Sequence, residues 1–218
     1  MRYRHVIWDW NGTLLDDTWL CVEVLNGLLR AAGKKAITLD AYRANFGFPV
    51  EGFYAWLGFE VSGDTFHELS VRFITEYNRR RYECALQPGA RAALERLHTA
   101  GLGQSLLSAY REDTLREVVG HYGLTSFFTH LSGTDNILAR GKVARGQDHL
   151  RTIALHDDPR AVVLVGDTHH DQEVAAALGA DCLLLHHGHI HPGRFGQSDA
   201  AQAADLPAAV AWILEAIR

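Results

Sequence analysis

Cysteine is scarce in this chain of 218 residues, which carries only Cys21, Cys84 and Cys182. Their number is odd and their spacing is wide, so they predict buried, reduced thiols rather than a disulfide framework or a zinc site. The chain also lacks an apolar stretch long enough to cross a bilayer, and residues 1–5 lead into an expected strand without the apolar region of a signal peptide. We therefore expect a cytoplasmic protein with no membrane partner.

A run of basic residues interleaved with aromatic side chains is also missing. Lys plus Arg number 21 against 26 Asp plus Glu, which gives a formal charge of −5. This balance argues against nucleic acid as a partner, because a protein that follows a phosphate backbone needs clustered cations. With 47% hydrophobic and 22% charged residues, the chain can bury a substantial core as one domain, or as one domain with an insertion.

The pattern of apolar residues divides the chain into two kinds of segment. Residues 16–85 are helical in pattern throughout, with helices expected near 16–33, 40–45, 50–57 and 64–82. After residue 88, strands expected at 104–107, 127–131, 161–165 and 181–185 alternate with helices. This alternation predicts an α/β fold with a doubly wound parallel sheet: a Rossmann-like core of residues 1–15 and 86–218, with an inserted small all-helical cap domain of residues 16–85.

Two apolar strands deliver carboxylates into the loops that follow them. Asp9 follows the strand expected at residues 5–8, and Asp167 and Asp171 follow the strand expected at 161–165. In an open parallel sheet such loops lie at the same edge, so the three carboxylates can form one cluster. Three carboxylates that close need a cation among them, and hard oxygen ligands favour Mg2+. The sequence therefore predicts a metal-dependent phosphoryl site.

The same loops resemble those of a known family. Asp-x-Asn-Gly-Thr-Leu at residues 9–14, followed by Gly-Asp-x-x-x-Asp at residues 166–171, is similar to the motif pair of the haloacid dehalogenase-like (HAD) hydrolase superfamily. The resemblance covers nearly the whole chain, since residues 105–108 close an apolar strand and Lys142 lies beyond it. The helical insertion, residues 45–58 above all, looks like the small cap of the phosphoglycolate-phosphatase-like branch, which excludes water from the reaction.

The resemblance implies a nucleophile and a metal site. Asp9 is the candidate nucleophile, whose carboxylate attacks phosphorus to form an aspartyl-phosphate. Asp9, Asp167 and Asp171 are candidate Mg2+ ligands, together with the backbone carbonyl of Asn11.

The resemblance also implies a phosphate-binding set, which consists of Asn11, Gly12, Ser108, Ala109 and Lys142. Ser108 and the backbone N–H that follows it can hydrogen-bond a phosphoryl oxygen. Lys142 offsets the charge of the nucleophile and the phosphoryl group, with Arg140 and Arg145 as rival cations.

Asn11 departs from the family pattern. Phosphatases of this family usually carry Asp two residues after the nucleophile, where it protonates the leaving group and then activates water. An amide cannot transfer that proton. A positioned acid or base is typically worth ~100- to 10,000-fold in rate, and acyl and aryl phosphates need it least. His169 and His170 could carry the proton instead, against the plainer interpretation that they face solvent.

Other residues are weaker candidates for substrate contacts. His186, His187, His189 and His191 follow the last apolar strand, match no defined zinc spacing and predict a substrate-side loop. The helical insertion offers Arg43, Tyr54, Trp56, His67 and Arg72. A phosphonate-cleaving relative would need a cap lysine for a Schiff base, for which Lys34 and Lys35 are available.

The expected function is that of a Mg2+-dependent phosphatase, a phosphoric monoester hydrolase. The expected substrate is a small phosphorylated metabolite, with phosphoglycolate-like compounds as the family's first suggestion, and the expected state is a monomer or homodimer. Because of Asn11, two alternatives stay open: cleavage of a carbon–phosphorus or carbon–halogen bond, and a catalytically weak relative that binds a phosphorylated ligand.

Overall fold

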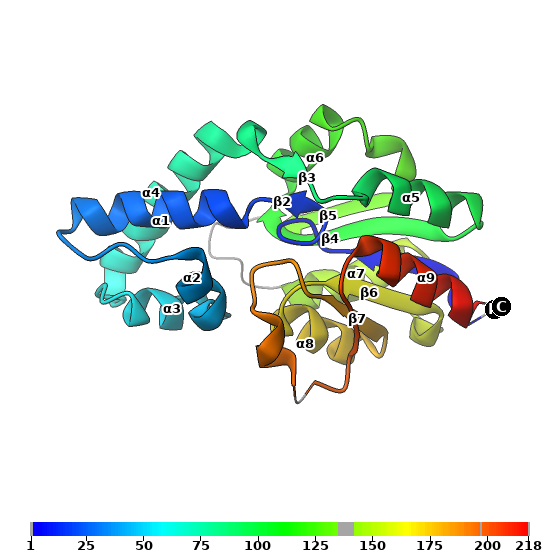
Figure 1. The fold of residues 1–218 in the computed structure, drawn as a ribbon. Helices are drawn as coiled ribbons and strands as arrows, with labels where there is room; N and C mark the ends of the chain where they lie inside the picture. The colour runs from blue at the N-terminus through cyan, green and yellow to red at the C-terminus, as the bar shows by residue number, and fades with distance from the viewer. Residues whose placement is uncertain (1, 135–141, 197, 218) are drawn as a thin grey trace.

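A six-stranded parallel sheet forms the centre of the fold (Figure 1). The computed structural model describes residues 2–134, 142–196 and 198–217. The strands lie in the order β5-β4-β1-β6-β7-β8. Their bounds are β1 His5–Trp8, β4 Gly103–Arg111, β5 His130–Thr134, β6 Val162–Gly166, β7 Asp181–Leu185 and β8 Ala201–Ala203. β1 lies between β4 and β6, so the loop after β1 leaves the sheet at its middle.

Helices cover both faces of this sheet, as the doubly wound prediction requires. Successive side chains of a strand point to opposite faces. Val6 and Trp8 pack in the cluster that holds α5 (Ala90–Thr99) and α9 (Leu206–Ala216). Ile7, between them, packs with α7 (Lys142–Thr152) and α8 (His169–Leu178). α6 (Glu112–His121) contacts β4 and β5. The predicted α/β fold class is confirmed.

Four helices form the insertion between β1 and α5. They are α1 Thr18–Ala31, α2 Leu39–Asn45, α3 Val50–Trp56 and α4 Gly63–Arg80. The chain enters and leaves through two short strands, β2 Leu15–Asp16 and β3 Ala85–Leu86, which pair antiparallel. Figure 1 shows the insertion to one side of the sheet, beyond the carboxyl end of β1. We call α1 to α4 the helical insertion.

Three details of the sheet differ from the expectations. β4 does not close at Ser108 but continues to Arg111, with a shift of register against β5 after Leu107. β5 begins only at His130, because residues 125–127 form a 3-10 turn. β8, a strand of three residues with the sequence Ala-Gln-Ala, was not expected; pairing with β7 creates it, since so short a segment carries no pattern of its own.

The expected thiols are free in the structure. Cys21 and Cys84 are buried as expected, whereas Cys182 is only half-buried. Within the described part of the chain, each helix is too short or too polar to span a bilayer.

Buried histidines beneath β1 and β4 make stability depend on pH. The ring of His149 lies within 2.6 Å of the Ser105 hydroxyl and 2.9 Å of the Ser132 hydroxyl, and His5 lies 2.7 Å from that of Ser105. Burial lowers the pKa of His149 to about 3 and that of His5 to about 4. Both rings are therefore neutral in the folded protein at pH 5, while an unfolded histidine binds a proton there.

We expect the free energy of unfolding to fall as pH drops from 6.5 towards 4. The unfolded chain then binds protons that the folded protein excludes. This difference lowers the free energy of unfolding by at most about 1.4 kcal/mol per pH unit for each buried histidine. Urea unfolding at pH 7.5, 6.0 and 5.0 measures this slope. His149→Gln should reduce it and the exposed control His156→Gln should not; equal slopes for His149→Gln and the wild type would contradict the account.

Candidate active site

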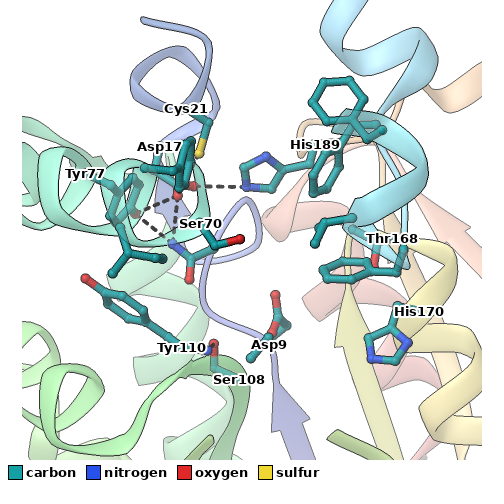
Figure 2. A pocket seen from close by; sticks show the side chains of 18 of the residues that line it. Asp9, Asp17, Cys21, Ser70, Tyr77, Ser108, Tyr110, Thr168, His170 and His189 are labelled. Atoms are coloured by element: carbon teal, nitrogen blue, oxygen red, sulfur yellow. Dashed lines mark hydrogen bonds and ion pairs between the residues drawn. The ribbon is translucent and has the colours of Figure 1, made fainter. Parts of the chain in front are cut away.

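Three buried carboxylates meet at the carboxyl ends of β1 and β6. Asp9 directly follows β1, Asp167 directly follows β6, and Asp171 lies in the first turn of α8. One oxygen of each lies within 4.8 Å of those of the other two. β1 and β6 are neighbouring parallel strands in register, so both loops open at the same edge. The predicted cluster is thus present, and Figure 2 shows Asp9 pointing into a cavity above it.

The start of α8 orients Asp171. Thr168 is the N-cap residue, and its backbone N–H and hydroxyl donate to Asp171 Oδ2 at 3.0 and 2.8 Å. This capping box begins the helix at His169, three residues before the helix expected from the sequence. The other oxygen of Asp171 is left to face the cluster.

Lys142 lies between two of the carboxylates. Its Nζ donates to Asp9 Oδ1 at 2.7 Å and to Asp171 Oδ1 at 2.6 Å, and the side chain is 3% exposed. Burial lowers the pKa of Lys142, but the two carboxylates outweigh burial and raise it, so the ammonium stays charged. Arg140, one rival cation, lies outside the described residues. Arg145, the other, is not among the described residues that line the cavity.

One ammonium does not balance three carboxylates. Burial raises the pKa of Asp9 and of Asp167, and neighbouring carboxylates raise both further. Burial raises the pKa of Asp171, but the charge of Lys142 and the hydrogen bonds from Lys142 and Thr168 together outweigh burial and lower it. The surplus negative charge and the all-oxygen donor set fit a hard divalent cation such as Mg2+.

Two glycines allow the loops to close around Asp167. A Cβ on Gly12 would lie 2.4 Å from Asp167 Oδ2, and one on Gly188 would lie 2.0 Å from it. Gly12 also has φ of 73°, which other residues rarely adopt. The N–H of Gly12 donates to Asp17 Oδ1 at 2.8 Å and to the Leu15 carbonyl at 3.0 Å, so it is occupied within the loop.

Asn11 points towards the helical insertion. Its Nδ2 donates to Asp17 Oδ2 at 2.7 Å and to the Tyr77 hydroxyl at 2.8 Å. The amide therefore holds the junction between β1 and α1 together. It carries no titrating proton, so the position supplies a fixed donor where a carboxyl would supply an acid.

Ser108 and Ala109 line the cavity, and Figure 2 shows Ser108 across it from Thr168 and His170. Because β4 continues to Arg111, both residues lie within the strand and not at its end. Ser108 Oγ accepts a hydrogen bond from the backbone N–H of Tyr110 at 3.2 Å. The hydroxyl proton of Ser108 can still turn towards a group in the cavity.

Asp17 and His189 form a buried ion pair that the sequence interpretation missed. His189 Nε2 lies 3.2 Å from Asp17 Oδ1, and the Tyr77 hydroxyl donates to Asp17 Oδ2 at 2.7 Å (Figure 2). Burial lowers the pKa of His189, but the Asp17 charge and hydrogen bond outweigh burial and raise it to about 9. Burial raises the pKa of Asp17, and the charge of His189 together with hydrogen bonds from His189, Tyr77 and Asn11 more than reverses this. One feature of the sequence could have indicated this pair: Asp17 is a further acidic residue that directly precedes an apolar helix.

His189 also connects three parts of the fold. Its Nδ1 lies 2.9 Å from the hydroxyl of Tyr42 in α2, and its backbone N–H donates to Asp167 Oδ2 at 2.6 Å. His189 of the predicted histidine loop is therefore buried, and its positive charge is already paired with the negative charge of Asp17.

The two histidines considered as proton carriers have different surroundings. His170 lines the cavity, packs 4.8 Å from the ring of Phe48, and has a buried Nε2 without a hydrogen-bond partner among the described residues. His169 instead lies 3.2 Å from the carbonyl of Arg194 and is not among the described residues that line the cavity. Only His170 is placed to meet a ligand.

Of the five residues that the helical insertion offers as substrate contacts, Tyr54 alone is among the described residues that line the cavity. Tyr54 lines the cavity, but Arg43 donates to the carbonyls of His186 and Ile190 instead. Trp56, His67 and Arg72 are exposed on the outer sides of their helices and are not among the described lining residues. The structure therefore gives no support to these four residues as substrate contacts, since other side chains of the insertion face the cavity.

The lysines needed for phosphonate cleavage also lie away from the cavity. The Lys34 ammonium lies 5.6 Å from the ring centroid of Phe59, and Lys35 is exposed. Neither is among the described residues that line the cavity. This placement gives no support to a Schiff-base mechanism.

A parallel α/β core, with carboxylates where its central strands end and a helical insertion beside them, defines a class of Rossmann-like proteins with a buried acidic site at the edge of the sheet. Within this class, the chain belongs to the haloacid dehalogenase-like hydrolase family, whose family model matches residues 6–185. The resemblance seen in the sequence is confirmed.

Curated relatives of the chain carry two different names. The tyrosine-protein kinase PtkA of Mycobacterium tuberculosis is 27% identical over 84% of this chain, which spans 62% of that protein's length. A phosphoglycolate phosphatase of Rhodobacter capsulatus is 24% identical, with 84% of each chain covered.

Solved structures support the fold. A haloacid dehalogenase-like family protein from Streptococcus pneumoniae has a TM-score of 0.82 at 20% identity, covering 97% of this chain and 99% of its own. The Mycobacterium tuberculosis PtkA structure has a TM-score of 0.78 at 24% identity, covering 97% of this chain and 98% of its own.

We expect Mg2+ to raise the melting temperature by several degrees, because a ligand bound by the folded state alone stabilises it. Differential scanning fluorimetry in MgCl2 and in NaCl of equal ionic strength measures the shift. Asp167→Asn should remove most of the difference between the two salts, whereas the exposed control Asp157→Asn should keep it. Equal shifts in Asp167→Asn and the wild type would exclude a cation at this cluster.

Proposed function

We propose that this protein is a Mg2+-dependent phosphatase that hydrolyses a small phosphorylated metabolite through an aspartyl-phosphate on Asp9. The observation that carries the proposal is the buried group of Asp9, Asp167, Asp171 and Lys142 beneath a cavity. Membership of the hydrolase family and the phosphoglycolate phosphatase relatives support the same class of reaction. The cytoplasmic location and the oligomeric state stay predictions.

In the first step, a carboxylate oxygen of Asp9 attacks phosphorus while the ester oxygen departs with its electron pair. Lys142 Nζ lies 2.7 Å from Asp9 Oδ1 and offsets the negative charge that gathers there. The Ser108 hydroxyl and the N–H of Ala109 are the candidate donors to the phosphoryl oxygens. Water then releases phosphate and restores the Asp9 carboxylate.

The carboxylates of Asp9, Asp167 and Asp171, with the backbone carbonyl of Asn11, would hold Mg2+. When bound, the ion supplies charge stabilisation to the phosphoryl group. In this proposal residues 16–85 act as the cap, and their contacts with the core keep water from the reacting atoms. Arg194 ties the two parts together by donating to the carbonyl of Phe46 at 2.5 Å.

Asp9→Asn should abolish turnover, because an amide oxygen is a poor nucleophile and the ligand charge is lost. We expect kcat for p-nitrophenyl phosphate in Mg2+ to fall by roughly 1,000-fold or more. Asp157→Asn, whose side chain is 91% exposed, is the matched control and should keep wild-type activity. Retention of turnover in Asp9→Asn would refute the covalent mechanism.

Asn11→Asp should increase the hydrolysis of alkyl phosphates selectively. Burial beside the Asp17 carboxylate raises the pKa of a carboxyl group at this position and keeps it protonated for the leaving oxygen. We expect kcat/KM for an alkyl monoester to rise by about 100-fold, and that for p-nitrophenyl phosphate to change little. Asn11→Ala, which adds no acid, is the control. An equal gain on both substrates, or on neither, would show that the amide is not what limits alkyl esters.

A further inference from the structure

Aromatic side chains are the most frequent kind in the walls of the cavity above Asp9, and aliphatic side chains such as Ile74 lie among them. The helical insertion supplies Tyr42, Phe46, Phe48, Phe53, Tyr54 and Phe73. The rings of Phe46 and Phe53 meet edge to face with centroids 5.4 Å apart. The cavity holds about 190 Å³. A substrate whose phosphoryl group lies at Asp9 would therefore place the rest of its body against apolar rings.

The insertion offers no cation for a second anionic group. Among the described residues that line the cavity, Lys142 is the only lysine or arginine, and it already contacts Asp9 and Asp171. His189 is charged, but Asp17 pairs with it at 3.2 Å. A carboxylate on the substrate would lose its hydration here and would meet only the His170 ring and hydroxyl groups, with no lysine or arginine left to pair with it, which is costly. This wall disfavours phosphoglycolate-like compounds.

Asn11 also argues against alkyl esters such as phosphoglycolate, for a reason that is independent of the cavity walls. Without a proton donor at this position, the leaving oxygen departs as an anion, which favours leaving groups of low basicity. A phenol has a pKa of about 10, whereas the pKa values of water and aliphatic alcohols are much higher. An apolar alkyl phosphate would fit against the apolar walls, but its alkoxide is a poor leaving group.

We propose that the substrate is an aryl phosphomonoester whose aromatic leaving group is uncharged and packs within this aromatic cavity. The inference rests on the proposed phosphatase function. An Asp9 oxygen forms a bond to phosphorus while the P–O(aryl) bond breaks, and the electron pair stays on the phenolate, which takes a proton from water. A second water then attacks phosphorus while the P–O bond to Asp9 breaks and its electron pair returns to the carboxylate. The proton that this water loses neutralises the hydroxide left by the first water, so the net reaction converts aryl phosphate and water to phenol and inorganic phosphate.

Four substrates separate charge from leaving-group basicity in the wild-type protein with Mg2+. Phenyl phosphate and 4-carboxyphenyl phosphate have leaving groups of similar basicity but differ in charge. Phosphoglycolate and ethyl phosphate represent the alkyl esters. We expect kcat/KM for phenyl phosphate to exceed those of the other three by at least about tenfold. We also expect phenylphosphonate, which cannot be hydrolysed, to bind more tightly than phosphonoacetate by calorimetry.

Two residues of α4 provide a matched pair of variants. Ile74 lines the cavity, whereas Val71, one turn away, is 41% exposed on the outer side. Ile74→Lys places a cation on the cavity wall and should shift the ratio of phenyl to 4-carboxyphenyl turnover at least about tenfold towards the charged ester. Val71→Lys should leave the ratio unchanged. Circular dichroism checks that both variants are folded.

The outcomes distinguish the inference from the function on which it rests. Turnover that requires Asp9 but is fastest with phosphoglycolate or 4-carboxyphenyl phosphate would overturn the aryl assignment and leave the phosphatase intact. A lack of Asp9-dependent turnover with all four esters would overturn both. Fastest turnover of phenyl phosphate, tighter binding of phenylphosphonate and a shift confined to Ile74→Lys would establish the assignment.

Discussion

The proposed active site depends on one contact, which the ammonium of Lys142 makes with the carboxylates of Asp9 and Asp171. Three carboxylates are buried together. Burial raises the pKa of Asp9 and of Asp167, which favours their neutral, protonated forms. Lys142 opposes this by donating to Asp9 and Asp171 at 2.7 and 2.6 Å. Its charge does not balance the cluster, and the remaining negative charge makes a place for a divalent cation. The same desolvation that is costly in the protein alone strengthens charge stabilisation during reaction.

A second buried ion pair, Asp17–His189, joins the helical insertion to the core. Asp17 directly precedes α1 as its N-cap residue, while His189 comes from the loop after β7 and also contacts Tyr42 in α2. Removing one partner of such a pair would leave an uncompensated buried charge, which is more costly than the pair is stabilising. This pair therefore helps to hold the aromatic walls over Asp9, and it couples the position of the insertion to the loop that surrounds Asp167.

Much of the fold and of the acidic cluster could be predicted because both depend on local patterns. The alternation of strands and helices after residue 88 requires a parallel sheet, and the order of β1 and β6 brings Asp9 next to Asp167. Predictions failed where a long-range contact decides the outcome. β8 exists through its pairing with β7, and Arg43 is drawn to backbone carbonyls of the histidine loop.

The groups that we propose to react are thus identified by short motifs, because residues that end neighbouring parallel strands share one edge of the sheet whatever surrounds them. Asn11 likewise shows, from the sequence alone, that no carboxyl group stands two residues after Asp9 to donate a proton. The aromatic cavity and the charge state of His189 come from tertiary structure alone. Tyr42 and His189 are 147 residues apart in sequence yet 2.9 Å apart in space, and no local pattern records which residues such a closure will bury together.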